Sequence, residues 1–320
     1  MGYPRLNLRQ HSLRAVITVV VVAVAVLAGI SPGEAPASAR TASGAGTASG
    51  AGTASSAGTA SSAPTEWALV HHLSTCLAPG QAKPTVVLVH GAWADTSSWS
   101  GEVTTLQAAR YDVRAIANPL QNLTTDSQYV ADFLRTIHGP VVLAGHSYGG
   151  SVISNAAAGI ANVKRLVYVD AAAPAPGQTT GQLSGAGSVL TTKTPSQLFD
   201  TTAYPNAPTG ASELYLKENI FIHNFARDLP RSEAERLWAS QRGAATAAFG
   251  TPSQAAAWKT IPSWYFISTG DQIITPASEL AMAHRAHSHI TMFHGGSHLT
   301  LISHPNAVTA VIASAICSQR

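Results

Sequence analysis

The apolar run VVLAGHSYGGSV at residues 141–152 constrains the fold more than any other stretch of this 320-residue sequence. Its first half has the Val and Leu content of a buried β-strand, and it stops abruptly at a serine flanked by glycines. Gly145 and Gly149 permit a sharp turn that leaves the Ser147 side chain exposed between a strand and a helix. The helix that begins at Tyr148 would point its N-terminal amides at the same place. This arrangement predicts that Ser147 is a nucleophile.

Short β-branched runs alternate with longer amphipathic runs on both sides of this turn. From Pro84 onward we expect strands at 85–91, 112–118, 140–146, 163–170, 263–270 and 288–296. Helices are expected with them at 98–109, 125–137, 148–160, 277–286 and 307–318. The alternation predicts an α/β fold, with a mostly parallel sheet and helices on both faces.

The alternation is interrupted after residue 171. Residues 172–257 are rich in Pro, Gly, Thr and Ser, and we expect helical stretches within them at 211–221 and 231–241. An insertion of this length between two strands is too long for a plain connector. We interpret it as a helical lid sub-domain over the carboxyl edge of the sheet.

The N-terminal segment has the three parts of a secretory signal peptide. Three arginines precede the uncharged run 15–30, and Ala37-Ser38-Ala39 follows as a small-x-small cleavage site. Residues 1–39 are therefore predicted to be a signal peptide cleaved after Ala39, which leaves a secreted protein without stable membrane insertion. The alternative is an uncleaved membrane anchor, because the 16 residues of the run are just short of a spanning helix.

Residues 40–64 form a linker rich in Ala, Gly, Ser and Thr, and the folded domain is expected at 65–320. The linker repeats the hexads TASGAG, TASGAG, TASSAG and TASSAP, which offer no side chains large enough to bury. We expect it to be disordered. Without the signal peptide, 16 Lys and Arg residues face 15 Asp and Glu residues. With no basic patch to explain, the sequence does not favour a nucleic-acid partner.

The sequence has two cysteines, Cys76 near the start of the expected domain and Cys317 near its end. In an exported protein such a pair favours a disulfide, which would tie the N-terminal extension to the last helix. The alternative is two unpaired buried thiols. Neither cysteine has a C-x-x-C neighbour or a matching set of histidines, so a metal or redox role is not favoured.

A serine nucleophile needs a base, and thirteen histidines compete for that role. His298 is the best candidate because it lies on a glycine loop after the last strand and before the last helix. His294 and His304 are interpreted as structural. Three further histidines are expected at the surface, and no carboxylate or cysteine accompanies them, so no metal site is predicted: His284, His287 and His289.

Two aspartates could orient the base. Asp271 follows the strand at 263–270, and Asp170 follows the strand at 163–170. Both preserve the chain order Ser, Asp, His. Asp170 could instead be a capping carboxylate beside the lid hinge, and the residues alone leave the choice open.

The second donor to a developing oxyanion should come from the loop after the first strand. Gly91 permits a close approach of the backbone, and the amide of Ala92 is the natural partner of the Tyr148 amide. Trp93 and Trp99 either wall the pocket or pack in the core.

These motifs together make the chain resemble an α/β-hydrolase over roughly residues 84–315. The motifs are VLVHGAW, GHSYGG, VYVDAAAP, FARDLPRSEAERLWASQR, IPSWYFISTGDQIITP and GGSHLTLISHP. They are similar to the branch that contains plant-type methylesterases, hydroxynitrile lyases and many bacterial esterases. The resemblance implies Asp271 rather than Asp170 as the acid, and His298 as the base, seven residues before Pro305.

The resemblance also speaks against two related activities. The lyases of this branch carry a threonine after the first-strand histidine and a lysine after the catalytic one, where this chain has Gly91 and Leu299. Relatives that open epoxides or remove halides have an aspartate at the elbow, where this chain has Ser147.

We therefore expect an exported serine hydrolase that cleaves a small-molecule carboxylic ester without a cofactor. The apolar lid side chains could line an acyl or alcohol site or form the core of the lid: Phe221, Phe225, Leu237, Trp238 and Phe249. One alternative is an acyltransferase or perhydrolase that uses the same three residues. Another is a non-catalytic binding protein of the same fold.

Overall fold

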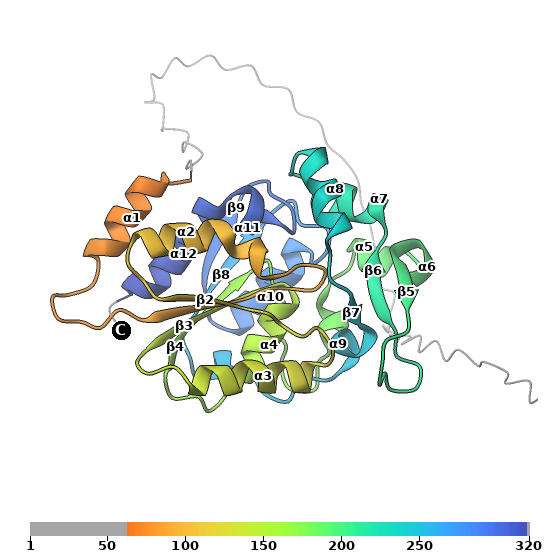
Figure 1. Ribbon diagram of the computed structural model, residues 1–320, viewed down its shortest axis with the longest axis horizontal. Coiled ribbons are helices and arrows are strands. Elements are labelled where there is room, and N and C mark those ends of the chain that lie inside the picture. Colours follow the sequence, from red (N-terminus) through yellow and green to blue (C-terminus); the bar gives the residue numbers. More distant parts are fainter. Residues whose placement is uncertain (1–62, 319–320) are drawn as a thin grey trace, which may run out of the picture. The chain divides into compact units, whose positions relative to one another are not determined.

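The computed structural model describes residues 63–318 of the chain (Figure 1). The predicted signal peptide, and all of the predicted linker except its last two residues, lie outside the described residues. Within 63–318, no helix is long and apolar enough to cross a membrane.

A sheet of six parallel strands forms the centre of the domain, in the order β2-β1-β3-β4-β8-β9. Its strands are β1 (Thr85–Val89), β2 (Val113–Ile116), β3 (Val141–His146), β4 (Val163–Val169), β8 (Ser263–Ser268) and β9 (His289–Phe293). Every residue of β1, β3 and β8 is buried, as expected for strands that helices cover on both faces.

Helices cover both faces of the sheet, which confirms the predicted fold class. Three helices cover one face: α1 (Glu66–Thr75), α2 (Ser100–Ala108) and α12 (Pro305–Cys317). They lie above the sheet in Figure 1. On the other face are α3 (Leu123–Arg135), α4 (Tyr148–Ala156) and α10 (Pro276–Arg285), as right-handed crossovers between parallel strands require.

Two short helical segments flank these elements: η1 (Thr96–Trp99) precedes α2, and α11 (Thr300–Ser303) precedes α12. A disulfide joins Cys76, the residue that caps the C-terminus of α1, to Cys317 at the end of α12. This confirms the predicted pairing. It closes a span of 241 residues and holds α1 against α12.

The connection from β4 to β8 (residues 170–262) contains short elements and a second, small sheet. Its helical segments are η2 (Thr180–Leu183), α5 (Val189–Thr192), α6 (Pro195–Leu198), α7 (Glu218–Ile220), η3 (Phe221–Phe225), α8 (Arg231–Ala239), α9 (Thr246–Gly250) and η4 (Ala257–Lys259). Its strands are β5 (Phe199–Thr202), β6 (Glu213–Leu216) and β7 (Ala244–Ala245). That this connection acts as a lid stays a prediction.

The helix expected over 211–221 is wrong in its first half, because Glu213–Leu216 forms β6. This strand pairs antiparallel with β5 on one side and β7 on the other. Both partners lie outside the expected helix, and their pairing satisfies backbone groups that a local helix would otherwise have satisfied. The helix propensity of Glu and Leu is a weak preference that this tertiary pairing overrides. The helix expected at 231–241 is present as α8.

Candidate active site

Ser147 lies at the turn between β3 and α4, with a backbone φ of 54°. A positive φ is strained for a residue with a side chain, and such strain persists only where the surroundings hold the backbone in place. Here the Ser147 amide donates to the carbonyl of Val169, and the Ser147 carbonyl accepts from the amides of Gly150 and Ala172. The turn therefore presents the Ser147 hydroxyl at the carboxyl end of β3.

Three glycines near this turn allow backbones to approach more closely than a side chain would permit. A Cβ on Gly91 would lie 2.5 Å from the Cβ of Ser147, and one on Gly149 would lie 2.4 Å from the carbonyl oxygen of Val89. A Cβ on Gly145 would lie 2.6 Å from the Gly149 carbonyl oxygen. The loop after β1 and the first turn of α4 can pack together only because these positions lack side chains.

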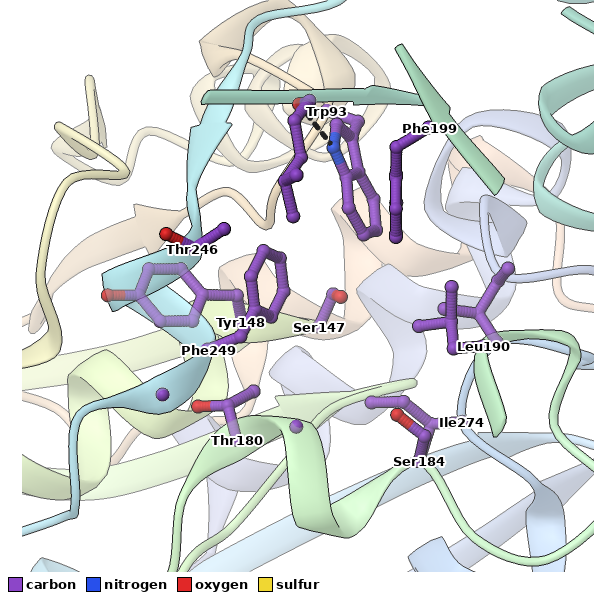
Figure 2. A pocket seen from close by; sticks show the side chains of 14 residues that line it. Trp93, Ser147, Tyr148, Thr180, Ser184, Leu190, Phe199, Thr246, Phe249 and Ile274 are labelled. Atoms are coloured by element: carbon purple, nitrogen blue, oxygen red, sulfur yellow. Dashed lines mark hydrogen bonds between the residues drawn. The ribbon is translucent and has the colours of Figure 1, made fainter. Parts of the chain in front are cut away.

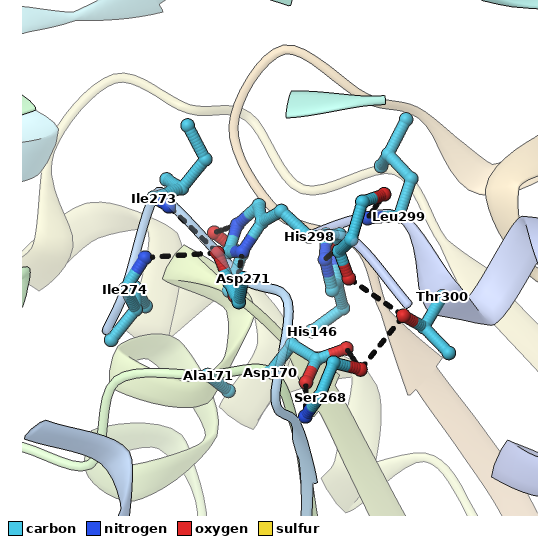
Figure 3. Close-up of polar contacts among 12 residues, drawn as sticks. His146, Asp170, Ala171, Ser268, Asp271, Ile273, Ile274, His298, Leu299 and Thr300 are labelled. Atoms are coloured by element: carbon cyan, nitrogen blue, oxygen red, sulfur yellow. Dashed lines mark hydrogen bonds and ion pairs between the residues drawn. The ribbon is translucent and has the colours of Figure 1, made fainter. Parts of the chain in front are cut away.

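His298 and Asp271 lie next to each other on loops that follow β9 and β8 (Figure 3). His298 Nε2 is 2.7 Å from Ser147 Oγ, and His298 Nδ1 is 2.6 Å from Asp271 Oδ2. The other carboxyl oxygen, Asp271 Oδ1, accepts from the amides of Ile273 and Ile274 at 2.7 and 3.2 Å. The structure thus brings together the predicted nucleophile, base and acid in one hydrogen-bonded chain.

Burial controls the protonation of the His298 imidazole. The ring is fully buried, and desolvation lowers its pKa from 6.5 to about 3, so the ring is neutral at physiological pH. Its Nδ1–H donates to Asp271, which leaves Nε2 as an acceptor for the hydroxyl of Ser147. Burial also raises the pKa of Asp271, and hydrogen bonds from the amides of Ile273 and Ile274 oppose that rise.

Asp170, the other candidate acid, makes no hydrogen bond to His298 in the described part of the chain. Its Oδ1 accepts from the amide of Ser268 at 2.7 Å, and its Oδ2 is 2.9 Å from Ser268 Oγ. Figure 3 shows this carboxyl directed toward Ser268 rather than toward the imidazole. The side chain of Asp271 therefore contacts the base, and that of Asp170 does not.

The two predicted oxyanion donors come from the loop after β1 and from the first residue of α4. Ala92 belongs to the loop after β1, and its amide donates to no other group among residues 63–318. The amide of Tyr148 is in the first turn of α4, where helix geometry provides no acceptor. Both N–H groups are available to a ligand oxygen.

A cavity of about 320 Å³ opens beside Ser147 and is lined by uncharged side chains only (Figure 2). Its lining residues are Trp93, Ser147, Tyr148, Thr180, Gly181, Ser184, Leu190, Phe199, Leu214, Thr246, Phe249, Gly250, Ile273 and Ile274. Most of them come from the β4–β8 connection. The cavity is thus built where that connection meets the carboxyl edge of the sheet.

The Trp93 side chain lines this cavity, whereas Trp99 is fully buried in the core. The Trp93 indole stacks on Phe199 and Phe249, and its Nε1–H donates to the carbonyl of Leu214 in β6. Of the apolar side chains expected in the lid, Phe249 lines the cavity. Phe221, Phe225 and Leu237 line a smaller neighbouring cavity of about 50 Å³. Trp238 instead donates through its indole to the Leu216 carbonyl.

Two functional contacts were not expected from the sequence. The Nε2–H of His146, the residue before Ser147, donates to the carbonyl of His298 at 2.8 Å and so ties the base to the elbow. The Tyr148 hydroxyl donates to Asp126 Oδ2 at 2.8 Å, which fixes the ring that walls the cavity. The only sequence signal for either contact was proximity to Ser147, because the partners are distant in the chain.

Two groups of the described residues have the ligand types of a metal site. In the first, His72 lies beside Cys76 and Cys317, whose sulfurs are joined in the disulfide. The second is the cluster formed by the carboxyls of Asp170, Asp271 and Glu279. Two of these carboxyls already have protein partners. Asp271 accepts from His298 and two amides, and Asp170 contacts Ser268. The cluster thus offers only the Glu279 carboxyl without a hydrogen-bond partner, which is a poor set for a metal ion.

Residues 86–311 match the sequence profile of the alpha/beta hydrolase family. The chain belongs to this family. A relative among characterised sequences, the alpha/beta hydrolase nvfD of Aspergillus novofumigatus, is 25% identical over 256 residues, which cover 73% of this hydrolase and 96% of nvfD.

Solved structures share the fold of this hydrolase at low sequence identity. Polyneuridine aldehyde esterase has a TM-score of 0.62 and 16% identity, and the match covers 73% of this chain and 99% of that one. A pyrethroid hydrolase from Sphingobium faniae JZ-2 has a TM-score of 0.59 and 23% identity, covering 74% and 98%. In both comparisons the match spans almost the whole of the other chain.

Proposed function

We propose that the protein is an exported serine hydrolase that cleaves carboxylic esters through an acyl-enzyme. The observation that carries this proposal is the unbroken hydrogen-bonded chain from Ser147 through His298 to Asp271, beside an apolar cavity. A nucleophile, a base and an orienting acid in this geometry are the requirements of the reaction. Membership of a hydrolase family, and the esterase named among the structures of the same fold, support the same conclusion.

In the first half of the reaction, Ser147 Oγ attacks the ester carbonyl carbon and its proton moves to His298 Nε2. Asp271 holds the Nδ1–H tautomer and stabilises the imidazolium while it exists. The same proton then passes to the alcohol oxygen as the ester C–O bond breaks, leaving the acyl group on Ser147. In the second half, His298 takes a proton from water as the water oxygen attacks the acyl carbon. That proton then passes to Ser147 Oγ as the bond from Oγ to the acyl carbon breaks, which releases the acid.

The developing oxyanion is assigned to the amides of Ala92 and Tyr148. Both amides lack an acceptor in the described structure, and the Gly91 backbone lies against Ser147 because it has no side chain. A donor of this kind typically lowers the barrier by about 3 kcal/mol. Backbone amides are also held rigidly, so they need no reorganisation when the charge forms.

The cavity favours neutral esters with apolar groups of moderate size. No charged side chain lines it, so a substrate carboxylate or ammonium would lose its hydration there without gaining a partner. Four aromatic and four Leu or Ile side chains line it, and the hydroxyls of Thr180, Ser184 and Thr246 supply polar groups. One of the solved structures with the same fold is a pyrethroid hydrolase.

Export follows from the predicted signal peptide and agrees with the Cys76–Cys317 disulfide, because such bonds persist in oxidising compartments. The mass of the protein recovered from the medium of a host that secretes it tests this point. We expect a chain that begins at Arg40 and has no free thiol. A retained N-terminal segment would favour the membrane anchor instead.

The esterase proposal is tested with p-nitrophenyl esters of increasing acyl length, using the chain from Arg40 and its Ser147→Ala variant. We expect wild-type turnover of the shorter esters and none above background for Ser147→Ala. Ser314→Ala, which changes an exposed serine of α12, is the matched control and should behave like wild type. Turnover that survives in Ser147→Ala would overturn the assignment of the nucleophile.

The same assay separates the alternatives. Methanol or hydrogen peroxide added as a competing acceptor would reveal acyl transfer as a new ester or a peracid. A folded wild-type protein that turns over none of the esters, and does not react with a fluorophosphonate probe, would favour a non-catalytic binding protein.

A further inference from the structure

We infer that Asp170 holds a proton in the folded protein and, as a neutral carboxylic acid, positions the loops that carry Asp271 and His298. This inference rests on the proposed function, since it adds a positioning residue to the same site. It starts from the three buried carboxyls of Asp170, Asp271 and Glu279, each of which has one oxygen within 4.8 Å of an oxygen of the other two. Three negative charges so close together in the protein interior would repel strongly.

A chain of hydroxyl groups leads away from Asp170 (Figure 3). Asp170 Oδ2 is 2.9 Å from Ser268 Oγ, which is 2.7 Å from Thr300 Oγ1. Thr300 Oγ1 is in turn 2.6 Å from the carbonyl oxygen of Ser297. All four residues are buried, so these contacts are shielded from solvent.

With an ionised Asp170, the hydroxyl chain has one hydrogen-bond acceptor more than it has protons to donate. A carbonyl oxygen only accepts, so the Thr300 hydroxyl proton goes to Ser297. The single Ser268 hydroxyl proton then faces two acceptors, Thr300 Oγ1 and Asp170 Oδ2. A proton on Asp170 Oδ2 removes the shortage: Asp170 donates to Ser268, Ser268 to Thr300, and Thr300 to Ser297. The remaining oxygen, Asp170 Oδ1, accepts the Ser268 amide as a carbonyl oxygen should.

The ionisable groups around Asp170 favour the neutral form. Within residues 63–318 no salt bridge includes Asp170 or Glu279, and both Glu279 carboxyl oxygens are buried without a hydrogen-bond partner. Asp228 and the Tyr265 phenol also act on this region, and neither supplies a positive charge. The guanidinium of Arg285 instead donates to the Gln178 side chain and the Ala173 carbonyl.

Desolvation also favours a protonated Asp170. Burial raises the pKa of Asp170 well above its ordinary value, and the negative charge of Asp271 raises it further. Burial likewise raises the pKa of Glu279, where the nearby Asp170 and Asp271 act in the same direction. Asp271 differs because its oxygens face three N–H donors and no acceptor that would need a proton from it.

The backbone at Asp170 is also held in a strained conformation, with a φ of 43°. Its amide donates to the carbonyl of Phe266, which fixes the end of β4 against β8. Non-glycine residues keep such a conformation only where surrounding contacts determine it.

The hydroxyl chain links this fixed point to both catalytic loops. Ser268 ends β8 three residues before Asp271, and Ser297 directly precedes His298. Through the chain, Asp170 restrains the two loops relative to each other. A neutral Asp170 also places no second negative charge beside that of Asp271.

The test compares Asp170→Asn with Asp170→Ala in the mature secreted protein. Asparagine reproduces the neutral acid, since its NH₂ group donates to Ser268 Oγ and its carbonyl accepts the Ser268 amide. We expect Asp170→Asn to keep kcat/KM within about threefold of wild type, and Asp170→Ala to lose about 10- to 100-fold in kcat because the loops shift. The pH profile of Asp170→Asn should coincide with that of wild type. A displaced acid limb in Asp170→Asn would show that a charge had been removed and would overturn the inference.

A second pair of variants keeps the test decisive if Asp170→Ala fails to fold. Thr300→Val preserves shape and removes the hydroxyl in the middle of the chain, so kcat should fall with little change in KM. Thr309→Val is its matched control, because Thr309 is equally buried and its hydroxyl has no hydrogen-bond partner. Equal kcat values for these two variants would show that the chain does not position the site.

Infrared difference spectroscopy reads the proton directly. The spectrum of wild type minus Asp170→Asn at neutral pH should contain the C=O stretching band of a protonated carboxyl group. Carboxylate bands in its place would overturn the inference. This measurement needs no turnover, so it still decides the state of Asp170 if the esterase proposal fails for lack of activity in wild type.

Discussion

Asp271 and Asp170 follow neighbouring strands of one sheet and are both buried, yet they differ in the hydrogen-bond donors that surround them. Asp271 accepts hydrogen bonds from the His298 ring and from two backbone amides. Asp170 accepts one amide and adjoins a chain of hydroxyls that is one proton short. Burial disfavours the charge of both carboxyls, and the number of donors around each one differs. Equal burial of the two carboxyls therefore does not imply equal charge.

Removing the charge of Asp271 should have the largest effect on activity. Asp271→Asn should lower kcat by about 10⁴-fold, because the side-chain amide favours the wrong tautomer of His298. Asp170→Asn, the same substitution on the neighbouring strand, should leave kcat close to wild type. Steady-state kinetics of the two variants, side by side, measure the difference. Similar losses in both would mean that the two carboxyls carry the same charge.

A loss of kcat in the aspartate variants must be distinguished from a general loss of folding stability. Cys76→Ser combined with Cys317→Ser removes the disulfide, which joins α1 to the end of α12 and lies outside both loops, and should lower the free energy of unfolding by about 2–5 kcal/mol. Urea denaturation measures this loss. The folded double variant should keep the wild-type kcat. If its kcat falls as far as that of Asp170→Ala, the effect at Asp170 reflects weakened folding rather than positioning.

The pH dependence of kcat/KM tests the protonation state of His298. Only neutral His298 can accept the serine proton, so activity is lost as the pH falls through its pKa. Burial lowers that pKa to about 3, which places the loss below the ordinary imidazole value of 6.5. We therefore expect kcat/KM to stay nearly constant from about pH 8 down to about pH 5.5. A midpoint at or above 6.5 would show that the imidazole is more exposed to water than the structure indicates.

Substitution of Glu279, the third buried carboxyl of the cluster, should have the smallest effect, and that effect is on the free energy of unfolding. Glu279→Gln replaces a buried carboxyl that has no hydrogen-bond partner, so the free energy of unfolding at about pH 5 should change by no more than about 1 kcal/mol. Folding raises the pKa of Glu279, so its contribution to stability is present below its unfolded pKa and is lost as the pH rises. Glutamine has no proton to lose. The variant should therefore gain stability relative to wild type between about pH 5 and pH 9 in urea denaturation, and an unchanged difference would contradict the raised pKa.

The parallel sheet and the chain from Ser147 to Asp271 could be anticipated because their signals are local. The strand before Ser147, the glycines around it and the loops of Asp271 and His298 each lie within short stretches of sequence. The order of such loops along the carboxyl edge follows from the topology of a parallel sheet. Resemblance to a known family was needed only to choose between Asp271 and Asp170.

The cavity wall and the state of Asp170 could not be anticipated, because they depend on distant contacts. Phe199 reaches Trp93 only because β5 pairs with β6, a strand whose sequence favours a helix. The proton on Asp170 depends on Thr300, which lies 130 residues further along the chain. Neither partner carries a motif that marks it.

The bond between Cys76 and Cys317 also sets an order of events during biosynthesis. Cys76 leaves the ribosome long before Cys317, which lies 241 residues later. The pair can close only after every residue between them has been synthesised and α12 has met α1. A polypeptide that ends early anywhere before residue 317 therefore keeps a reactive thiol. Retention of that thiol distinguishes unfinished chains from finished ones in the compartment where the protein folds.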